Sequence, residues 1–572
     1  MNSPIFAAAR MTDQMVNRRE ELAAIKKAVF SPGRDTRLVV IEGEGGMGKT
    51  RLLREILRLA GHPDARFPAG MPVEAWQEKD SIIISELLDL ADSRLYTFHQ
   101  FLRALRNAFT WHKEANFDGF DRARAYHQRK ISEQADYQII QRAAEQAELA
   151  FFEDYQAIAD KKRLVWVLDT TEQLSFIGAS WLLEQGLLTP KDLSFSTQRR
   201  LLELLAEGKL PNTTILLAGR RREGKITFDA LKDKKNGAGD AYKVIKILLD
   251  NFSREDTQTY LDELARNWLR EQPDSQIATY LQHLATNSDR INVLWLYTGG
   301  QPVRLALYID ILTEGKTEPA ALQDTFADAK VRAGWNEASN QPDQEKLKQI
   351  QFEIEGEFIN LIFSKADELR PQILKILAQA RRDLNESHLH FLLDTPPGTN
   401  IEDWIEEPGR LQEIRATLES MKSLSFIKMT PVGWLILQDE MYRIYDEHAA
   451  ADEITRQDES LSRRDLYRQL LTLAEQEIKD LTHQKARHRE EDEGTLRWES
   501  PANTLNMKFA FLSEPEVQAR IDLDERLLQA QLEKLYYKLR LDPYEALNET
   551  FYDLAEEQRF SNIEGDAQLQ ME

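Results

Sequence analysis

The chain has 572 residues, of which 42% are hydrophobic and 30% are charged, and this balance excludes a disordered or collagen-like chain. At roughly 150 residues per domain, the length indicates several domains rather than one. Acidic residues outnumber basic residues by 96 to 74, and the formal net charge of −22 disfavours a nucleic-acid backbone as a partner. The chain has no cysteine, so disulfides and Cys-based zinc sites are excluded. It also lacks a signal peptide and any run of about 18 apolar residues, so we expect a cytoplasmic protein without a membrane segment.

The first 250 residues alternate predicted strands with predicted helices. A helical lead-in begins at Asn17 and ends at Ser31. Residues 95–160 contain few helix breakers and predict long charged helices. Short runs rich in β-branched and aliphatic residues predict five strands, at 37–42, 81–90, 163–169, 213–220 and 242–247. Strands that alternate with helices favour a parallel α/β sheet.

A glycine-rich segment, Gly43-Glu-Gly-Gly-Met-Gly-Lys49-Thr50, joins the first predicted strand to a helix. It fits the phosphate-loop pattern G-x-x-x-x-G-K-[ST] at every fixed position. In such a loop backbone N–H groups point at the phosphates, the lysine reaches the β and γ oxygens, and the threonine hydroxyl ligates Mg²⁺. We therefore expect ATP or ADP with Mg²⁺, and the lysine, threonine and flanking elements argue against a plain turn. The expected nucleotide contacts are Gly43, Gly45, Gly46, Met47, Gly48, Lys49, Thr50 and Arg51.

Two acidic residues follow the third predicted strand. A phosphate loop needs a carboxylate at the end of a neighbouring strand, and Asp169 occupies that place, so Thr50 and Asp169 are the expected metal ligands. Three residues later, Glu172 is placed to polarise a water molecule for attack on the γ-phosphate. The alternatives are that Asp169 caps a helix and that Glu172 is a first-turn carboxylate favoured by the helix dipole.

A basic residue, Arg220, follows the fourth predicted strand. It would stand at the carboxyl edge of the sheet, where ligands of open α/β folds bind, and there it could contact the γ-phosphate. Its neighbours Arg221 and Arg222 leave open the alternative of a solvated basic loop.

Five motifs occur in order along the chain. They are Asn17-Arg-Arg-Glu-Glu-Leu, the phosphate loop, Leu168-Asp-Thr-Thr-Glu, Leu217-Ala-Gly-Arg220 and Gly299-Gly-Gln-Pro302. Together they resemble the motifs of the STAND ATPases, the signal-transduction ATPases with numerous domains, which are relatives of the AAA+ ATPases and include the NACHT proteins. In that family the last three motifs correspond to Walker B, sensor 1 and G-x-P. The phosphate loop alone indicates only an NTPase, and its combination with a G-x-P motif is what points to this family over residues 10–310.

The resemblance implies further nucleotide contacts. In this family the lead-in lies against the adenine, so Arg18 is an expected contact. The G-x-P proline contacts the adenine from a lid, so Pro302 is another, although a proline that opens a helix also has a purely structural interpretation. Residues 437–441 resemble the family's Met-His-Asp switch region, with Gln438 in place of the usual histidine and Asp439 retained as the acid. Asp439 could instead cap the helix that follows it.

The strand pattern and the resemblance together predict an α/β P-loop NTPase of the AAA+/STAND kind, with a parallel sheet followed by a helical lid, a winged helix and a C-terminal all-α region. In that region the polar stretch 483–494 is expected to be a solvated helix or a disordered bridge. The winged helix is expected to end in two short strands, 426–429 and 434–437. The expected domains are 1–36 (helical lead-in), 37–252 (ATPase), 253–345 (helical lid with the G-x-P motif), 346–450 (winged helix) and 451–572 (C-terminal helical arm or start of a repeat sensor).

The resemblance predicts a switch that binds ATP, hydrolyses it slowly and forms a homo-oligomer in the ATP state, in bacterial defence or regulation. The lead-in is too short for an effector domain, so we expect a separate effector or sensor protein as partner. Two alternatives stay open: an origin-recognition-like AAA+ ATPase that binds DNA, and a scaffold in which ADP is purely structural. Acidic residues in the winged-helix segment disfavour DNA; they are Asp383, Glu386, Asp394, Glu402, Asp403, Glu406, Glu407, Glu413 and Glu419.

Overall fold

The computed structural model divides the chain into two compact units. Unit 1 comprises Met1–Phe117, Phe152–Asn385 and Glu413–Gln457, and unit 2 comprises Asp118–Phe151, Glu386–Gln412 and Asp458–Glu572. The residues that the structure describes are 5–6, 15–62, 75–90, 95, 98–132, 136–174, 197–220, 242–271, 273–313, 318–363, 369–380, 384–396, 404, 407–422, 424, 426–429, 435–437, 441–445, 447–448, 463–496 and 514–551.

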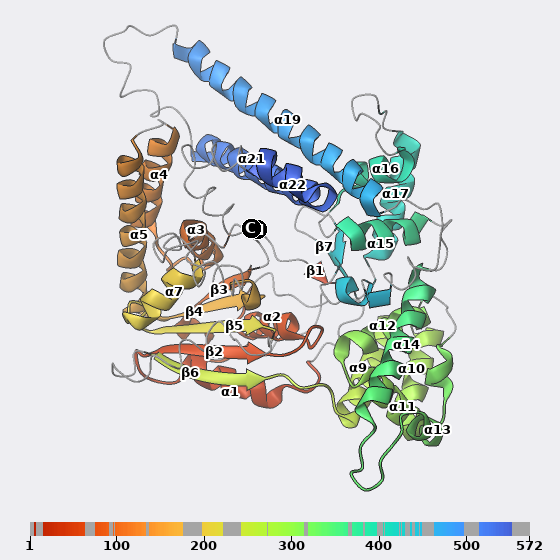
Figure 1. The fold of residues 1–572 in the computed structure, drawn as a ribbon. Coiled ribbons are helices and arrows are strands. Elements are labelled where there is room, and N and C mark those ends of the chain that lie inside the picture. Colours follow the sequence, from red (N-terminus) through yellow and green to blue (C-terminus); the bar gives the residue numbers. More distant parts are fainter. Residues whose placement is uncertain are drawn as a thin grey trace. The chain divides into compact units, whose positions relative to one another are not determined.

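A five-stranded parallel sheet forms a core in unit 1 (Figure 1). Its strands are β2 (Thr36–Glu42), β3 (Ile82–Asp89), β4 (Arg163–Asp169), β5 (Thr213–Gly219) and β6 (Tyr242–Leu248), in the order β3-β4-β5-β2-β6. Every residue of β4 and β5 is buried, which explains their nearly unbroken apolar sequences. The predicted parallel sheet and its five strands are confirmed.

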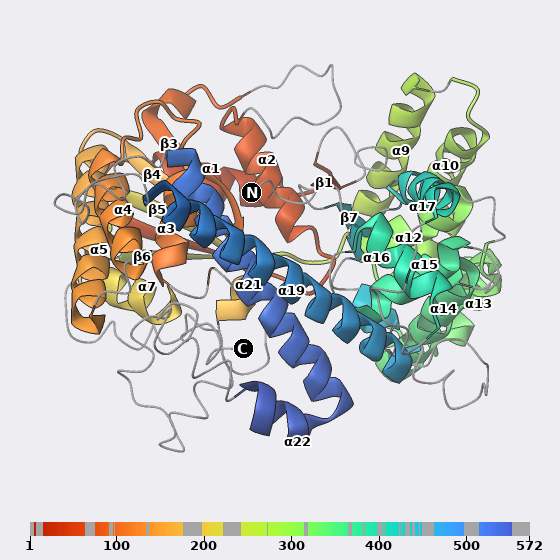
Figure 2. The same cartoon turned by 90° about the horizontal axis from the view of Figure 1, so that it is seen from above.

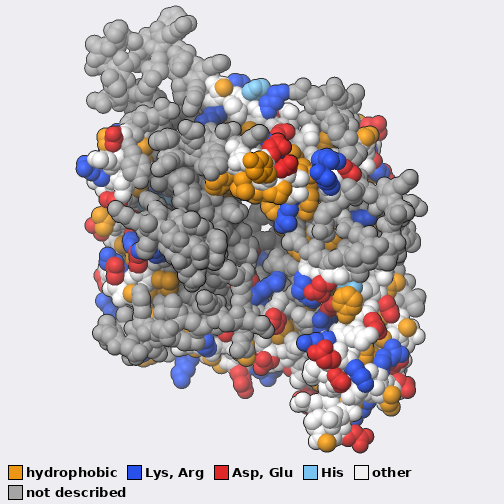
Figure 3. Space-filling model, in the orientation of Figure 1, with side chains coloured by type: hydrophobic (Ala, Val, Ile, Leu, Met, Phe, Trp, Pro, Cys, Tyr) orange, Lys and Arg blue, Asp and Glu red, His pale blue; other side chains and the backbone are white. Residues whose placement is uncertain are grey.

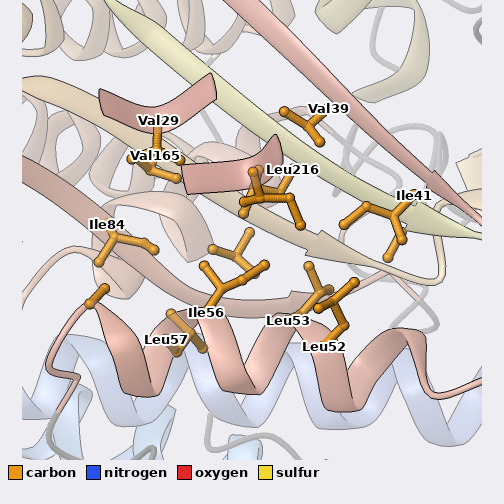
Figure 4. Close-up of a cluster of buried hydrophobic side chains, with 14 of the residues drawn as sticks. Val29, Val39, Ile41, Leu52, Leu53, Ile56, Leu57, Ile84, Val165 and Leu216 are labelled. Atoms are coloured by element: carbon orange, nitrogen blue, oxygen red, sulfur yellow. The ribbon is translucent and has the colours of Figure 1, made fainter. Parts of the chain in front are cut away.

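Helices α1 (Arg19–Phe30) and α2 (Lys49–Leu59) cover one face of this sheet. On α2 the residues Leu52, Leu53, Ile56 and Leu57 pack toward the strands (Figure 4). Their partners on the strands include Val39, Ile41, Val165 and Leu216. Burial of each such side chain contributes roughly 1.5–3 kcal/mol, so the position of α2, and with it the loop that precedes it, is firmly fixed.

The opposite face is covered by α3 (Phe98–Ala108), α7 (Thr197–Ala206) and the end of α5 (Tyr137–Ala159). Trp166 on β4 contacts both Phe101 and Tyr155, with ring centroids 5.9 Å apart in each case. In Figure 2, α1 and α2 lie on one side of the strands and α7 on the other. The sheet is thus a layer between two layers of helices, as expected for a parallel sheet.

Further helices of unit 1 follow β6 in the described part of the chain. They are α9 (Arg254–Glu271), α10 (Gln276–Thr286), α11 (Ser288–Thr298), α12 (Pro302–Thr313), α13 (Phe326–Arg332), α14 (Gln344–Phe363) and α15 (Leu369–Ala380). Side-chain caps set two of the boundaries, because Ser275 accepts a hydrogen bond at the start of α10 and Asn287 accepts two at the start of α11. Within its described residues the stretch 253–345 is largely helical, as expected, while its role as a lid domain stays a prediction.

A small antiparallel sheet of unit 1 contains the predicted hairpin, β7 (Ile427–Met429) and β8 (Leu435–Leu437). A third strand, β1 (Ile5–Phe6), pairs with β7 and was not expected, since only a helix was predicted in the lead-in. Two residues carry too little pattern to predict a strand; β1 forms because β7 offers it an open edge.

Unit 2 contains further helices: α4 (Asp118–Ser132), the first part of α5, α16 (Glu386–Asp394), α19 (Arg463–Leu496), α21 (Glu514–Leu541) and α22 (Pro543–Glu545), with a π-helical turn at Ala546–Phe551. Helix α17 (Pro408–Met421) spans the boundary between the units. The polar stretch 483–494 lies within α19, which confirms the helical alternative. Within the described residues, no helix combines the length and hydrophobicity that crossing a bilayer requires.

Candidate functional site

The phosphate loop lies between β2 and α2, as the sequence predicts. Lys49 is the first residue of α2, and its Nζ donates to the carbonyls of Gly43 and Glu44 at 2.8 Å each. Burial lowers the pKa of the Lys49 ammonium, while the negative charges of Glu172 and Asp169 act in the opposite direction. A cation held by two backbone carbonyls can exchange them for phosphate oxygens.

Thr50 and Asp169, the two predicted metal ligands, are in direct contact. Thr50 Oγ1 donates to Asp169 Oδ2 at 2.5 Å. Mg²⁺ is usually held by one or two protein oxygens, completed by water and substrate phosphates, and a hydroxyl beside a carboxylate fits that donor set. Among the described side chains, no group of three or more His, Asp or Glu could hold a metal without such help.

Glu172 and Arg220 also meet at this edge of the sheet. Glu172 lies in the short 3-10 helix Thr171–Leu174 that follows β4. Its Oε2 accepts the backbone N–H of Arg220 at 3.0 Å, and its Oε1 lies 3.5 Å from Arg220 Nε. Glu172, the candidate base, is 9% exposed. Its contacts with Arg220 keep its carboxylate at the end of β5.

A third carboxylate at this edge, Asp89, was missed by the sequence analysis. Asp89 ends β3 and is the neighbour of Asp169 in the register of the two strands. Its Oδ1 accepts the hydroxyl of Thr170 at 2.6 Å. The available signal was its place at the end of a predicted strand, the criterion that selected Asp169.

The start of α12 (Pro302–Thr313) contacts the phosphate loop directly. Gln301, the residue before α12, donates from Nε2 to the Gly45 carbonyl at 2.8 Å. Gly46 and Gly48 have φ of 74° and 85°, a region that favours glycine. A Cβ on Gly46 would lie 2.3 Å from Val303 Cγ1, so only glycine allows this approach. Pro302, the predicted contact, is the first residue of α12. The contacts of its neighbours Gln301 and Val303 with the loop were not predicted.

The lead-in is tied to the linker between β6 and α9. Arg18 Nη2 donates to the Asp250 carbonyl at 2.6 Å, and the Arg18 guanidinium lies 5.9 Å from the centre of the Phe252 ring. Asn17 Nδ2 donates to Asp256 Oδ2 at 2.8 Å. The expected contact of Arg18 with the adenine stays a prediction.

Three other predicted contacts have different outcomes. The Met47 side chain is buried in the hydrophobic core that α1 and α2 share with the strands, so only its backbone stays a predicted nucleotide contact. Arg51 Nη1 pairs with Glu55 at 3.0 Å along α2. Asp439 and its neighbour Gln438 lie outside the described residues.

No protein-family model matches the chain, and no curated protein matches it. It is similar to the solved ORC2 protein of Aeropyrum pernix, with a TM-score of 0.32 and 13% identity over 79% of this chain and 100% of that chain. A Walker-type ATPase of Pyrococcus abyssi has a TM-score of 0.32 and 16% identity, over 76% and 96% of the two chains. Drosophila ORC bound to DNA has a TM-score of 0.28 and 13% identity, over 76% and 95%. Likeness of this degree carries no argument about substrate or partner.

The arrangement as a whole defines the fold class. The loop with Lys49 follows a central strand of a five-stranded parallel sheet, the acid Asp169 ends a nearby strand, and Thr50 joins the two. The chain therefore has the α/β P-loop NTPase fold, followed by helical regions.

Proposed function

We propose that this chain is a P-loop ATPase controlled by nucleotide, in which the first turn of helix α12 responds to changes in the conformation of the phosphate loop. The observation that carries the proposal is the hydrogen bond from Gln301 to the Gly45 carbonyl, 2.8 Å long. Val303 adds a packing contact against Gly46. The first turn of α12 and the residue before it contact the loop. A bound phosphate that changes the conformation of the loop therefore also changes the contacts of this turn.

Five of the predicted residues have roles in the proposed reaction. Lys49 leaves the two loop carbonyls and binds the β and γ phosphate oxygens. Thr50 and Asp169 would hold Mg²⁺, which supplies neutralisation of phosphate charge when it is bound. Glu172 accepts a proton from the attacking water, and Arg220 stabilises the negative charge that develops beside it.

The test is hydrogen exchange of the wild type and two variants, with ADP and with ATP–Mg²⁺. In the wild type, nucleotide should slow exchange in the phosphate loop and change exchange in residues 299–308. Gln301→Ala should keep the loop response and lose the response at 299–308, because it removes the contact and leaves the loop intact. Lys49→Ala should lose both, since it deletes the loop cation.

A matched control is Gln349→Ala, which removes an exposed glutamine of α14 and should behave as the wild type. If nucleotide slows exchange in the phosphate loop of the wild type but leaves exchange in residues 299–308 unchanged, the proposed coupling between the loop and α12 is contradicted. The absence of any response in the wild type contradicts nucleotide binding altogether.

Two outputs of this ATPase are candidates. The solved structures named above are ORC proteins and a Walker-type ATPase, and a likeness of this degree leaves the DNA-binding alternative open beside the STAND switch. Charge favours the switch, since the formal net charge is −22 and DNA binding needs a basic surface. On the face drawn in Figure 3, the described Lys and Arg side chains are interspersed with Asp and Glu.

Mass photometry distinguishes the outputs. A rise in mass with ATP–Mg²⁺ alone supports a switch that assembles into a homo-oligomer. A rise that requires a DNA duplex and disappears in high salt supports DNA binding, because such contacts release counterions. One mass under all conditions supports a scaffold with structural ADP and contradicts both outputs.

A further inference from the structure

The chain makes a sharp turn where it leaves β4. Thr170, which follows Asp169, has φ of 56°, the left-handed region that β-branched residues rarely adopt. The next residues form the short helix Thr171–Leu174, which carries Glu172. The conformation of Thr170 therefore determines the direction in which Glu172 leaves the sheet.

Three hydrogen bonds hold this turn. Thr170 N donates to Asp169 Oδ1 at 2.9 Å, and Thr171 Oγ1 donates to the Ala218 carbonyl at 3.1 Å. The third joins the Thr170 hydroxyl to Asp89 Oδ1 at 2.6 Å. This third bond brings in a side chain from the neighbouring strand β3, so it fixes Thr170 relative to the sheet.

The turn places Glu172 in a narrow position at the end of β5. A Cβ on Gly219 would lie 2.4 Å from Thr171 Oγ1 and 3.0 Å from Glu172 Oε2, so the approach depends on glycine. Glu172 then accepts the N–H of Arg220 at 3.0 Å. A change of φ at Thr170 would move the Glu172 carboxylate away from this position.

We propose that Asp89 is a positioning residue for ATP hydrolysis, whose carboxylate holds Thr170 in the left-handed conformation that directs Glu172 to the end of β5. The inference rests on the proposed function, because it takes Glu172 as the group that activates water. Asp89 acts on Glu172 through Thr170, by a hydrogen bond.

Asp89 could instead act by its charge, as a second carboxylate for the metal beside Asp169. Burial lowers the pKa of Arg54 on α2 to about 10, while the charges of Asp169 and Asp89 oppose this shift, so Arg54 lies close to both carboxylates. A cation there offsets the repulsion of two adjacent acids. The two roles differ in what asparagine at position 89 would do, because an amide oxygen still accepts a hydrogen bond but has no charge.

The experiment measures ATP turnover and the affinity for ADP. Asp89→Ala and Thr170→Val both remove the hydrogen bond, and each should lower kcat by about 10–100-fold, as small misplacements of a reacting group do, with Kd for ADP unchanged. Asp89→Asn should stay close to the wild type. The double variant Asp89→Ala with Thr170→Gly should recover most of the lost kcat, because glycine adopts positive φ without a Cβ penalty.

Two results would overturn the proposal. If Asp89→Asn loses as much turnover as Asp89→Ala and needs more Mg²⁺, Asp89 acts by charge. If the double variant is as slow as Asp89→Ala, the conformation of Thr170 is not what Asp89 provides.

A failure of the proposed function is recognised separately, because the wild type would then show no ATP turnover. Thermal melting still tests the turn in that case. If adding Thr170→Gly restores the melting temperature that Asp89→Ala lowers, Asp89 stabilises the conformation of Thr170. If the single and double variants lose the same amount of melting temperature, the proposal is overturned.

Discussion

Arg304 and Glu355 form an ion pair in which Arg304 Nε donates to Glu355 Oε1 at 2.6 Å. Arg304 lies in the first turn of α12, just after Gln301, and Glu355 lies on α14 with 3% of its surface exposed. Glu355 also faces Arg443 at 3.7 Å and His448 at 3.9 Å, two residues that follow the β7–β8 hairpin. The start of α12 is thus connected to two places: Gln301, the residue before the helix, donates to the phosphate loop, and Arg304 pairs with Glu355, which faces the residues after the hairpin.

Replacement of Glu355 by glutamine should destabilise unit 1. The change leaves Arg304 and Arg443 without a buried counter-charge, and breaking a buried ion pair costs about 3–5 kcal/mol. Denaturant unfolding of Glu355→Gln measures the loss. Glu353→Gln, an exposed neighbour on the same helix, should change the free energy of unfolding by less than about 0.5 kcal/mol. Equal effects of the two variants would contradict a special role for the buried pair.

Removal of the charge of Glu172 should slow hydrolysis without loss of nucleotide. Glu172→Gln keeps the shape of the side chain but removes the base, which typically lowers turnover by about 10²–10⁴-fold. Phosphate release and ADP titration measure the two effects. Glu207→Gln, an exposed glutamate, serves as control. Unchanged turnover in Glu172→Gln would leave Glu172 as a carboxylate that favours the start of its short helix.

Asp169→Asn should change the need for magnesium. The amide still contacts Thr50 Oγ1, but the charge that attracts the cation is absent. We expect turnover to require a higher Mg²⁺ concentration, whereas the affinity for ADP in the presence of EDTA stays the same. A magnesium titration of turnover in the two proteins measures this. Identical titration curves would argue that Asp169 does not act on the metal.

Contacts at the outer edge of β3 lead us to expect that the stability of the protein depends on pH. Trp111 Nε1 donates to the Ile84 carbonyl, and Ile84 N donates to His112 Nε2, both at 3.0 Å. Because His112 Nε2 accepts a hydrogen bond, it cannot carry a proton, and only the neutral ring makes this contact. Burial lowers the pKa of His112 from 6.5 to about 4. In the unfolded chain His112 protonates first as the pH falls, so its contribution to stability is complete above pH 6.5 and is lost progressively toward about pH 4.

Thermal melting across that pH range tests this prediction. His112→Gln keeps an acceptor for the Ile84 N–H but does not titrate, so its melting temperature should fall less between about pH 6.5 and pH 4 than that of the wild type. The control His99→Gln changes a histidine on α3, the helix that precedes His112. Parallel curves for the wild type and His112→Gln would show that the hydrogen bond does not depend on the charge of His112.

Most of the ATPase sheet could be predicted because its signals are local. β4 and β5 are short runs of apolar residues bounded by polar ones, and the spacing of Gly43, Lys49 and Thr50 is complete within one segment. The resulting order of strand, loop and helix places Thr50 beside the end of a parallel strand. The contact between Thr50 and Asp169 confirms that they lie together, while their role as metal ligands stays a prediction.

The contacts missed by the sequence analysis depend on pairing between distant segments. Asp89 becomes significant only when β3 aligns with β4 and brings it beside Asp169. Gln301 donates to Gly45 across 256 positions of sequence, and no local pattern encodes that distance. The strand β1 exists only because β7 is there to pair with it.

The order of strands in the sheet has a consequence for synthesis on the ribosome. β2, which carries the phosphate loop, lies between β5 and β6, the last two strands of that sheet in the chain. A nascent chain therefore holds β2 without a native neighbour until β5 has emerged, and with only one until β6 follows. Such non-local pairing slows folding and exposes strand edges to aggregation. The loop sequence is among the first parts of the sheet to be translated, yet β2 gains its second neighbour only when β6 pairs with it. The strand that carries the loop is therefore one of the last to be fully paired.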